Sequence, residues 1–203
     1  MEKKPGAVLA LSAGGDCLAL YELLAKMQAA GEISFQNARI FPVTAFCGRE
    51  DVRLAGFLRR VDVKEENLFS LTEENFAQYD EWIEKQGGID LAVLNLGLNG
   101  RIGFNEPATP FDSLTHRQKI TDSSRRELEA VADGEKMPEF ALTMGIKTLV
   151  SARDILLISS GESRADAVFK MLYARNDSVV PAAFLQIPLN VTVYLDEASA
   201  QKL

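Results

Sequence analysis

Short apolar runs recur along the chain, and stretches with a helical periodicity separate them. The runs lie at residues 7–12, 40–46, 91–96, 155–160 and 191–195. Continuous apolar runs of this length, rich in branched residues, are typical of strands that are buried on both faces of a sheet. We therefore expect these runs to form the strands of the core.

Helices are expected between the runs, at residues 18–30, 73–85, 148–153 and 164–174. In the last of these, Ala165, Val168, Phe169 and Leu172 fall on one face, with charged residues elsewhere. Alternating strands and helices predict an α/β fold: a Rossmann-like, doubly wound, mostly parallel sheet with helices on both faces. Such sheets bind their ligands at the carboxyl ends of the strands.

A chain of 203 residues is long enough for one domain with a full core, so we expect residues 1–203 to form a single domain. The most polar and least periodic segment, residues 121–139, is expected to be a surface excursion or a lid. The composition, with 47% hydrophobic and 25% charged residues, is that of an ordinary folded soluble protein.

The net charge of -7 argues against nucleic acid as a partner. Phosphate backbones require clustered Lys and Arg, and the densest basic pairs here, at 59–60 and 125–126, are short and flanked by acids. No segment is long and apolar enough to span a membrane, so no membrane partner is expected. Cys17 and Cys47 have neither metal-ligand nor disulfide-framework spacing, which fits a reducing cytoplasm and predicts no metal.

A glycine turn follows the first expected strand, in LALSAGGDCLALYELL. Gly14 and Gly15 would let an anion approach the backbone N–H groups at the start of the next helix. The alternative is that the glycines serve the turn geometry alone. Asp16 is expected to be the N-cap of the helix, where it would compete with a phosphate for the same N–H groups.

A second polar loop follows the third expected strand, in LNLGLNGRIGFNEPATPFDS. Asn99, Arg101, Asn105 and Glu106 lie in or just beyond this loop, where α/β sheets place their ligands. Glu106 and Arg101 could form a structural ion pair. Alternatively, Glu106 carries or orients a proton, and Arg101 contacts a sugar oxygen or a phosphate.

A third turn, in SSGESRADAVFK, places Arg164 in the first turn of a helix, where the helix dipole disfavours a cation. Arg164 is therefore either a solvated side chain or an anion ligand. Three further candidates are His116, ten residues beyond Glu106, and Cys47 and Asp51, which follow the second expected strand.

Together these segments resemble the glucosamine-6-phosphate deaminase family, which includes galactosamine-6-phosphate isomerases and shares its fold with 6-phosphogluconolactonases. The central loop is similar to the family motif G-x-G-x-D-G-H-I-x-F-N-E-P, and LALSAGGDC is similar to the family's phosphate turn. ALTMGIKTLVSARDILLISSGESRADAV is also similar to a conserved family segment. The resemblance implies an aminosugar 6-phosphate as substrate, and neither a metal nor an organic cofactor.

The resemblance also assigns roles residue by residue. Glu106 matches the glutamate that supports the ring-opening histidine, Arg101 stands in the place of that histidine, and Asn99 stands in the place of its supporting aspartate. The base that removes the C2 proton would be either Cys47 or an acid from the pair that ends at Asp51.

For the phosphate, the resemblance implies a site at Gly14 and Gly15, where Asp16 replaces a hydroxyl residue. Arg164 stands in for the family's lysine, and His116 replaces an arginine.

The leading functional prediction is an enzyme that isomerises and deaminates glucosamine- or galactosamine-6-phosphate, with activity reduced or changed by these replacements. In this prediction Glu106 is the retained acid/base, Arg101 polarises a sugar oxygen or contacts the phosphate, and Arg164 is the phosphate cation. An arginine cannot cycle a proton near neutral pH, and the loss of a positioned acid or base lowers a rate by about 10²- to 10⁴-fold. The alternative is a noncatalytic sugar or sugar-phosphate binding protein, and either could assemble into a homo-oligomer. A sugar-responsive transcription regulator is disfavoured, because no helix-turn-helix precedes the first strand.

Overall fold

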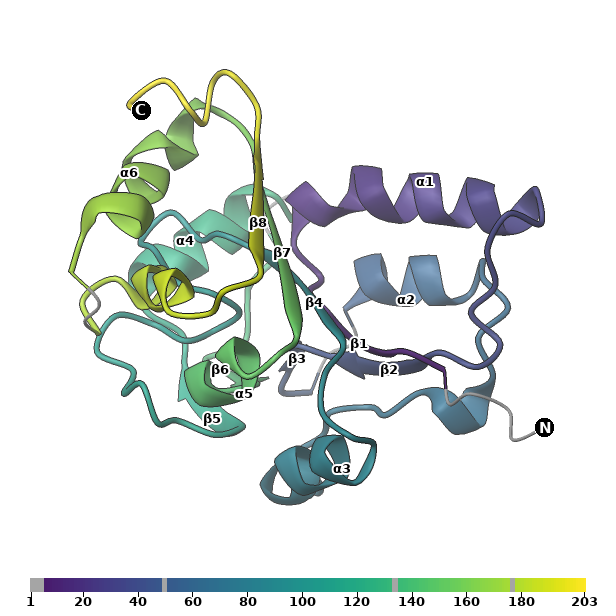
Figure 1. Cartoon of the computed structure of the whole chain (residues 1–203). Coiled ribbons are helices and arrows are strands. Elements are labelled where there is room, and N and C mark those ends of the chain that lie inside the picture. Colours follow the sequence, from purple (N-terminus) through teal and green to yellow (C-terminus); the bar gives the residue numbers. More distant parts are fainter. Residues whose placement is uncertain (1–5, 49–50, 133–134, 176–177) are drawn as a thin grey trace.

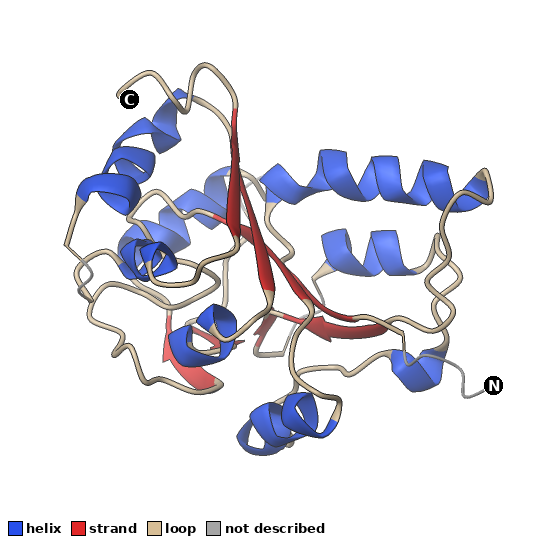
Figure 2. Cartoon of the chain, in the orientation of Figure 1, coloured by secondary structure: helices blue, strands red, loops and turns tan. Residues whose placement is uncertain are grey.

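A five-stranded parallel sheet forms the centre of the molecule (Figures 1 and 2). The computed structural model describes residues 6–48, 51–132, 135–175 and 178–203. Every neighbouring pair of strands in this sheet is parallel. The strand order is β2 (Arg39–Pro42), β1 (Val8–Leu11), β4 (Leu91–Asn95), β7 (Asp154–Ser159) and β8 (Val191–Leu195). The prediction of a mostly parallel, Rossmann-like sheet is confirmed.

Helices cover both faces of this sheet, as the alternating sequence pattern predicts (Figure 1). On one face, α1 (Leu18–Ala29) and α2 (Val52–Leu58) pack their apolar side chains against strand residues such as Leu11 and Val93. The other face is covered by α3 (Tyr79–Lys85), α5 (Ile146–Val150) and α6 (Ala165–Tyr173). Because both faces are buried, the strands carry continuous apolar runs.

The apolar run at residues 40–46 forms two strands instead of the single strand expected from its sequence. The chain leaves the parallel sheet at Val43, whose N–H donates to the carbonyl of Leu11 and whose carbonyl accepts from the N–H of Met144. The run therefore continues in a second, antiparallel sheet in the order β3 (Thr44–Phe46), β6 (Phe140–Thr143) and β5 (His116–Lys119).

Several helix predictions require correction. The segment 121–139, expected to be aperiodic, contains α4 (Asp122–Ala130), which Thr121 caps by accepting a hydrogen bond from the N–H of Ser124. The helix α2 was not predicted, and the helix expected at residues 148–153 begins two residues earlier. Short 3-10 turns complete the structure: η1 (Gly15–Cys17), η2 (Glu65–Asn67), η3 (Phe76–Gln78), η4 (Glu162–Arg164) and η5 (Pro181–Gln186).

The buried face of α6 differs from the expected one. Val168 and Ala165 are buried as predicted, together with Ala167 and Met171, whereas Phe169 and Leu172 are exposed. The buried stripe thus lies one position to the side of the predicted one. Within the described residues, no helix has the length and apolar character needed to cross a membrane.

Candidate active site

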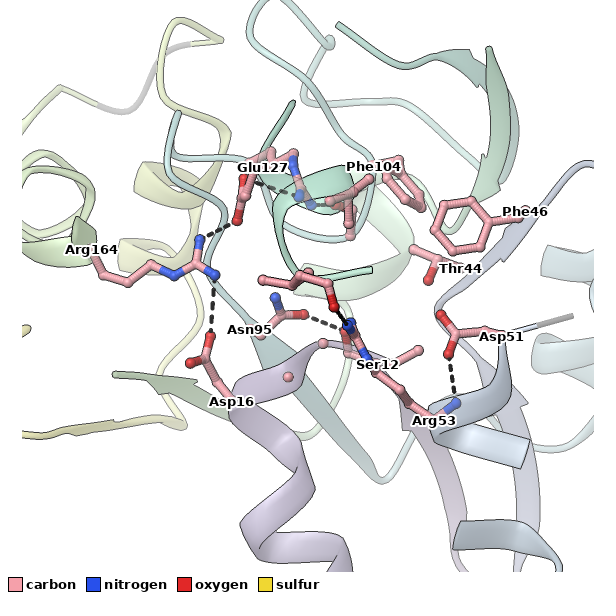
Figure 3. Close-up of a pocket in the computed structure, with 17 residues that line it drawn as sticks. Ser12, Asp16, Thr44, Phe46, Asp51, Arg53, Asn95, Phe104, Glu127 and Arg164 are labelled. Atoms are coloured by element: carbon pink, nitrogen blue, oxygen red, sulfur yellow. Dashed lines mark hydrogen bonds and ion pairs between the residues drawn. The ribbon is translucent and has the colours of Figure 1, made fainter. Parts of the chain in front are cut away.

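A cavity of about 210 Å³ lies where β1, β4 and β7 end (Figure 3). Its wall comes from the turn after β1, β3, the start of α2, the end of β4, the loop after β4, α4 and η4. The lining residues are Ser12, Ala13, Gly14, Gly15, Asp16, Thr44, Phe46, Asp51, Arg53, Asn95, Arg101, Gly103, Phe104, Glu127, Leu128, Val131 and Arg164. The cavity therefore brings together the glycine turn, Arg101, Asp51 and Arg164, which are far apart in the sequence.

The two glycines of the turn have different roles. A Cβ on Gly14 would lie 2.1 Å from the Cγ of Asn95, so only glycine allows the turn to pack against the end of β4. The Asn95 side chain is held there by the hydroxyl of Ser12, which donates to its Oδ1 at 2.5 Å. Around Gly15 nothing lies within 4 Å of a Cβ position, so the open space of the turn is at this residue.

Asp16 does not cap the helix, contrary to the sequence prediction. It lies inside η1, for which Gly14 is the N-cap residue, and no side chain caps either η1 or α1. Instead, its Oδ1 accepts a hydrogen bond from the hydroxyl of Ser160 at 2.6 Å. Its Oδ2 is buried without a hydrogen bond and faces the Nη2 of Arg164 at 3.7 Å (Figure 3).

An ion-pair chain crosses the cavity and joins Asp16, Arg164, Glu127 and Arg101. Arg164 is paired with Glu127 through its Nη1 and with Asp16 through its Nη2 (Figure 3). The other carboxylate oxygen of Glu127 lies 3.3 Å from the Nη2 of Arg101. Glu127, on α4, therefore bridges Arg101 and Arg164, which come from separate loops.

Arg101 is held on every side of its guanidinium. Its Nε donates to the hydroxyl of Ser124 at 3.0 Å and its Nη1 to the carbonyl of Gly103 at 2.8 Å, in addition to the ion pair with Glu127. Only 5% of the residue is exposed. A Cβ on Gly97 would lie 2.3 Å from the Cγ of Arg101, so this glycine makes room for the folded-back side chain. The ionic partner of Arg101 is Glu127, not Glu106.

Glu106 and Asn99 lie behind the cavity wall and are absent from its lining. The Glu106 carboxylate is buried and accepts hydrogen bonds from the Nδ2 of Asn99 at 2.7 Å and from the hydroxyl of Thr121 at 3.2 Å. These contacts fasten the loop to the residue that caps α4. Asn105, also buried, donates to the carbonyls of Ile102 and Met144.

Asp51 and Cys47, the two candidates for the C2 base, occupy different places. Asp51 lines the cavity and caps α2, where its Oδ1 accepts from the N–H of Arg53 at 3.0 Å. Cys47 lines a neighbouring cavity of about 450 Å³, which shares Thr44, Phe46 and Asp51 with the first. Burial raises the pKa of the Cys47 thiol above its usual value, which disfavours the reactive thiolate. The other acid of the pair, Glu50, lies outside the described residues.

His116 is separated from the cavity and lies on β5, in an open groove with Pro107 and Pro110. Its Nδ1 lies 2.7 Å from the carbonyl oxygen of Leu114, and its Nε2 lies 3.3 Å from the side chain of Gln118. The structure therefore groups Gly14, Gly15, Asp16, Arg164, Arg101 and Asp51, and leaves Cys47, Asn99, Glu106 and His116 outside this cavity.

Sequence reasoning missed Glu127, which is the acid at the centre of the ion-pair chain. A signal was present, because Ser124, Glu127, Leu128 and Val131 recur at the spacing of one helix face and the last three line the cavity. The charges of the lining balance: Asp16, Asp51 and Glu127 are matched by three arginines. Among the described residues, no group of three or more His, Cys, Asp or Glu side chains could hold a metal ion.

Comparison with known proteins identifies similar sequences over the whole chain. A family model described as glucosamine-6-phosphate isomerases/6-phosphogluconolactonase matches residues 1–194. A glucosamine-6-phosphate deaminase of Halalkalibacterium halodurans is 34% identical over 218 aligned residues, which cover 100% of this chain and 89% of the relative. A glucosamine-6-phosphate deaminase of Rhodopirellula baltica is 36% identical, with 100% and 87% covered.

Solved structures show the same relationship. A monomeric glucosamine-6-phosphate deaminase of the NagB superfamily matches with a TM-score of 0.90 and 31% identity, covering 100% of this chain and 90% of that one. A 6-phosphogluconolactonase from Leishmania guyanensis matches with a TM-score of 0.78 at 15% identity, covering 100% and 88%. The second likeness shows the shared fold alone.

Proposed function

The chain belongs to the glucosamine-6-phosphate isomerase/6-phosphogluconolactonase family, and we propose that it isomerises and deaminates glucosamine-6-phosphate or galactosamine-6-phosphate, with release of ammonia. The observation that supports this proposal most directly is the position of Asp51. Its carboxylate lines the same cavity as the glycine turn and Arg164, so a base and a phosphate cation can contact one sugar. The relatives named above as glucosamine-6-phosphate deaminases support the same reaction.

Asp51 acts as the base in this proposal. It takes the proton from C2 of the open-chain aminosugar and returns it to C1, while one amine proton passes through solvent to the C1 oxygen, so that the C1 aldehyde becomes a primary alcohol and C2 becomes an imine. Water then adds to the imine and ammonia leaves, which yields the 2-keto sugar phosphate. Between Asp51 and Cys47, the geometry favours Asp51, because only Asp51 lines the cavity that also holds Arg164.

The phosphate end of the site consists of Gly15 and Arg164. The open space at Gly15 lets a phosphate oxygen approach backbone N–H groups, and the guanidinium of Arg164 supplies a charge-assisted contact. An arginine does not transfer protons near neutral pH, and Arg101 is fixed by Ser124 and Gly103, so its role is to orient the sugar. Ring opening is then left to solvent.

Asn99 and Glu106 are positioning residues in this proposal. They act through Thr121 and the loop backbone, because neither side chain lines the cavity. Glu106 therefore fixes the geometry of the loop that presents Arg101.

The test is ammonia release by the purified protein with each of the two aminosugar phosphates. Asp51→Asn is expected to lower kcat by about 10²- to 10⁴-fold, as the loss of a positioned base does. Cys47→Ala is expected to stay within about threefold of the wild type, since its side chain faces another cavity. Asp62→Asn is the matched control, because it removes the same charge from an exposed site beside Ser34.

Binding of either sugar phosphate without ammonia release by the wild type would contradict the proposed reaction. It would favour the noncatalytic binding protein, for which the complete pairing of the Arg101 guanidinium is the supporting observation.

A further inference from the structure

The cation proposed for the phosphate already has two carboxylate partners. Arg164 is paired with Glu127 and with Asp16, and the three side chains are only 16%, 11% and 9% exposed. Asp16 also lies directly after Gly15, the open residue of the turn. A phosphate bound at this turn and at Arg164 would therefore have a buried carboxylate as its neighbour.

We propose that Asp16 is a specificity-determining residue that weakens the selection for a 6-phosphate, so that the site also binds unphosphorylated amino sugars, glucosamine and galactosamine. The reaction itself rests on the proposed function. The inference concerns only the group of the ligand that lies at Arg164.

Charge is the first argument for this specificity. The formal net charge of the residues that line the cavity is zero, because three acids face three arginines. The cavity therefore offers no excess positive charge to a phosphate dianion. Like charges repel strongly where water is largely excluded, and salt screens buried groups poorly. Phosphate binding at Arg164 must therefore compete with Asp16 and Glu127, whereas binding of a neutral hydroxyl need not.

The pairing of Asp16 is the second argument. Its Oδ2 has no hydrogen bond and faces the Nη2 of Arg164 at 3.7 Å, and the side chain is more than nine-tenths buried. A phosphate that takes the Arg164 guanidinium would leave this buried carboxylate without its ionic partner, which is costly. A neutral hydroxyl does not compete for Arg164 in this way.

Asp16, not Glu127, is the residue to change in a test. Glu127 also pairs with Arg101, so its removal would leave two buried arginines short of a partner. Asp16 contacts Arg164 and the hydroxyl of Ser160, and asparagine retains an oxygen that can accept from Ser160. Asp16→Asn thus removes the charge and preserves the turn.

The experiment measures kcat/KM for glucosamine-6-phosphate and for glucosamine, and compares their ratio between variants. In the wild type we expect this ratio to lie within about tenfold of one. Asp16→Asn is expected to raise the ratio by about 10- to 100-fold, the effect of strengthening one charge-assisted contact to a poorly solvated ion, mainly through a lower KM for the phosphate. Asp166→Asn, which removes an exposed acid paired with Lys202, is the matched control and should leave the ratio unchanged.

A wild-type preference for the phosphorylated sugar above about 1,000-fold would overturn the inference, and so would an unchanged ratio in Asp16→Asn. Asp16→Ser serves as a second variant if the asparagine protein melts early. A rise in the ratio with either variant supports the inference.

Calorimetric titration with glucosamine, glucosamine-6-phosphate and inorganic phosphate separates this inference from the proposed function. If no sugar yields ammonia, but the wild type binds glucosamine and Asp16→Asn gains phosphate affinity, the deaminase proposal fails and the inference stands. If the wild type yields ammonia with a strong phosphate preference, the deaminase proposal stands and the inference fails. Absence of binding to all three ligands in every variant overturns the inference.

Discussion

The loop after β4 and the turn after β1 follow neighbouring parallel strands, yet they use their polar residues in different ways. In the loop, residues 97–106, the side chains of Arg101 and Glu106 have all their main partners inside the protein. In the turn, residues 12–16, Asp16 keeps a carboxylate oxygen without a hydrogen bond and Gly15 leaves open space. The loop therefore presents a fully paired Arg101 to the cavity, whereas the turn leaves a carboxylate oxygen without a hydrogen bond and open space beside the ligand.

Among the substitutions that compare the loop with the turn, Arg101→Met is expected to have the largest effect on the free energy of unfolding. It leaves the hydroxyl of Ser124, the carbonyl of Gly103 and one oxygen of Glu127 without their buried partner. We expect the free energy of unfolding to fall by about 3 kcal/mol, as for a broken buried ion pair. Chemical denaturation measures this change. Lys85→Met, which breaks an exposed pair with Glu81, should change it by less than about 1 kcal/mol, and equal effects of the two substitutions would contradict the account.

Gly97→Ala and Gly15→Ala compare the backbones of the two regions. A Cβ on Gly97 would lie 2.3 Å from the Cγ of Arg101 and must displace it, so we expect a loss of about 1–3 kcal/mol. A Cβ on Gly15 meets nothing within 4 Å, and its effect should be below about 0.5 kcal/mol. Thermal unfolding of both variants measures the two losses of stability. A larger loss for Gly15→Ala than for Gly97→Ala would contradict the prediction.

The stability of the protein at alkaline pH depends on Cys17, a fully buried residue that directly follows the turn. Burial, followed by the charge of Asp16, raises the pKa of the Cys17 thiol from 9.0 to about 12. The folded state therefore keeps a proton that the unfolded state loses, and stability falls as the pH rises from 9 toward 12. The fall due to this thiol is about 1.4 kcal/mol per pH unit.

Denaturation of the wild type and of Cys17→Ala at pH 8 and at pH 10.5 checks this prediction. The wild type should lose about 2 kcal/mol more than the variant over this interval, since the interval spans about 1.5 pH units above the unfolded-state pKa. Parallel losses in the two proteins would show that another group is responsible.

The apolar runs predicted the parallel sheet well, because strands buried on both faces must be apolar along their whole length. The second sheet was not predicted. Its strand β5 reads HRQK and pairs on only one side, so it leaves no apolar signal. The change of sheet at Val43 depends on partners at Leu11 and Met144, which are distant in the sequence.

The candidate site was predicted in part for a related reason. Turns at strand ends can be recognised locally, and the predicted glycine turn, Asp51, Arg101 and Arg164 do line one cavity. The partner of Arg101 could not be identified in this way, because Glu127 reaches it from α4, in the segment whose helix was not predicted. Asp16 was placed as an N-cap by local rules, whereas tertiary contacts with Ser160 and Arg164 determine its position.

The most direct test of the account measures kcat/KM for ammonia release in Asp51→Asn and Glu106→Gln, at a temperature where both proteins are fully folded. Asp51 lines the cavity and Glu106 lies behind its wall, bonded to Asn99 and Thr121. We expect a loss of at least about 100-fold for Asp51→Asn and of less than about tenfold for Glu106→Gln. The reverse order would contradict the proposed mechanism, because the chemistry would then depend on Glu106, behind the cavity wall, and not on Asp51, which lines the cavity.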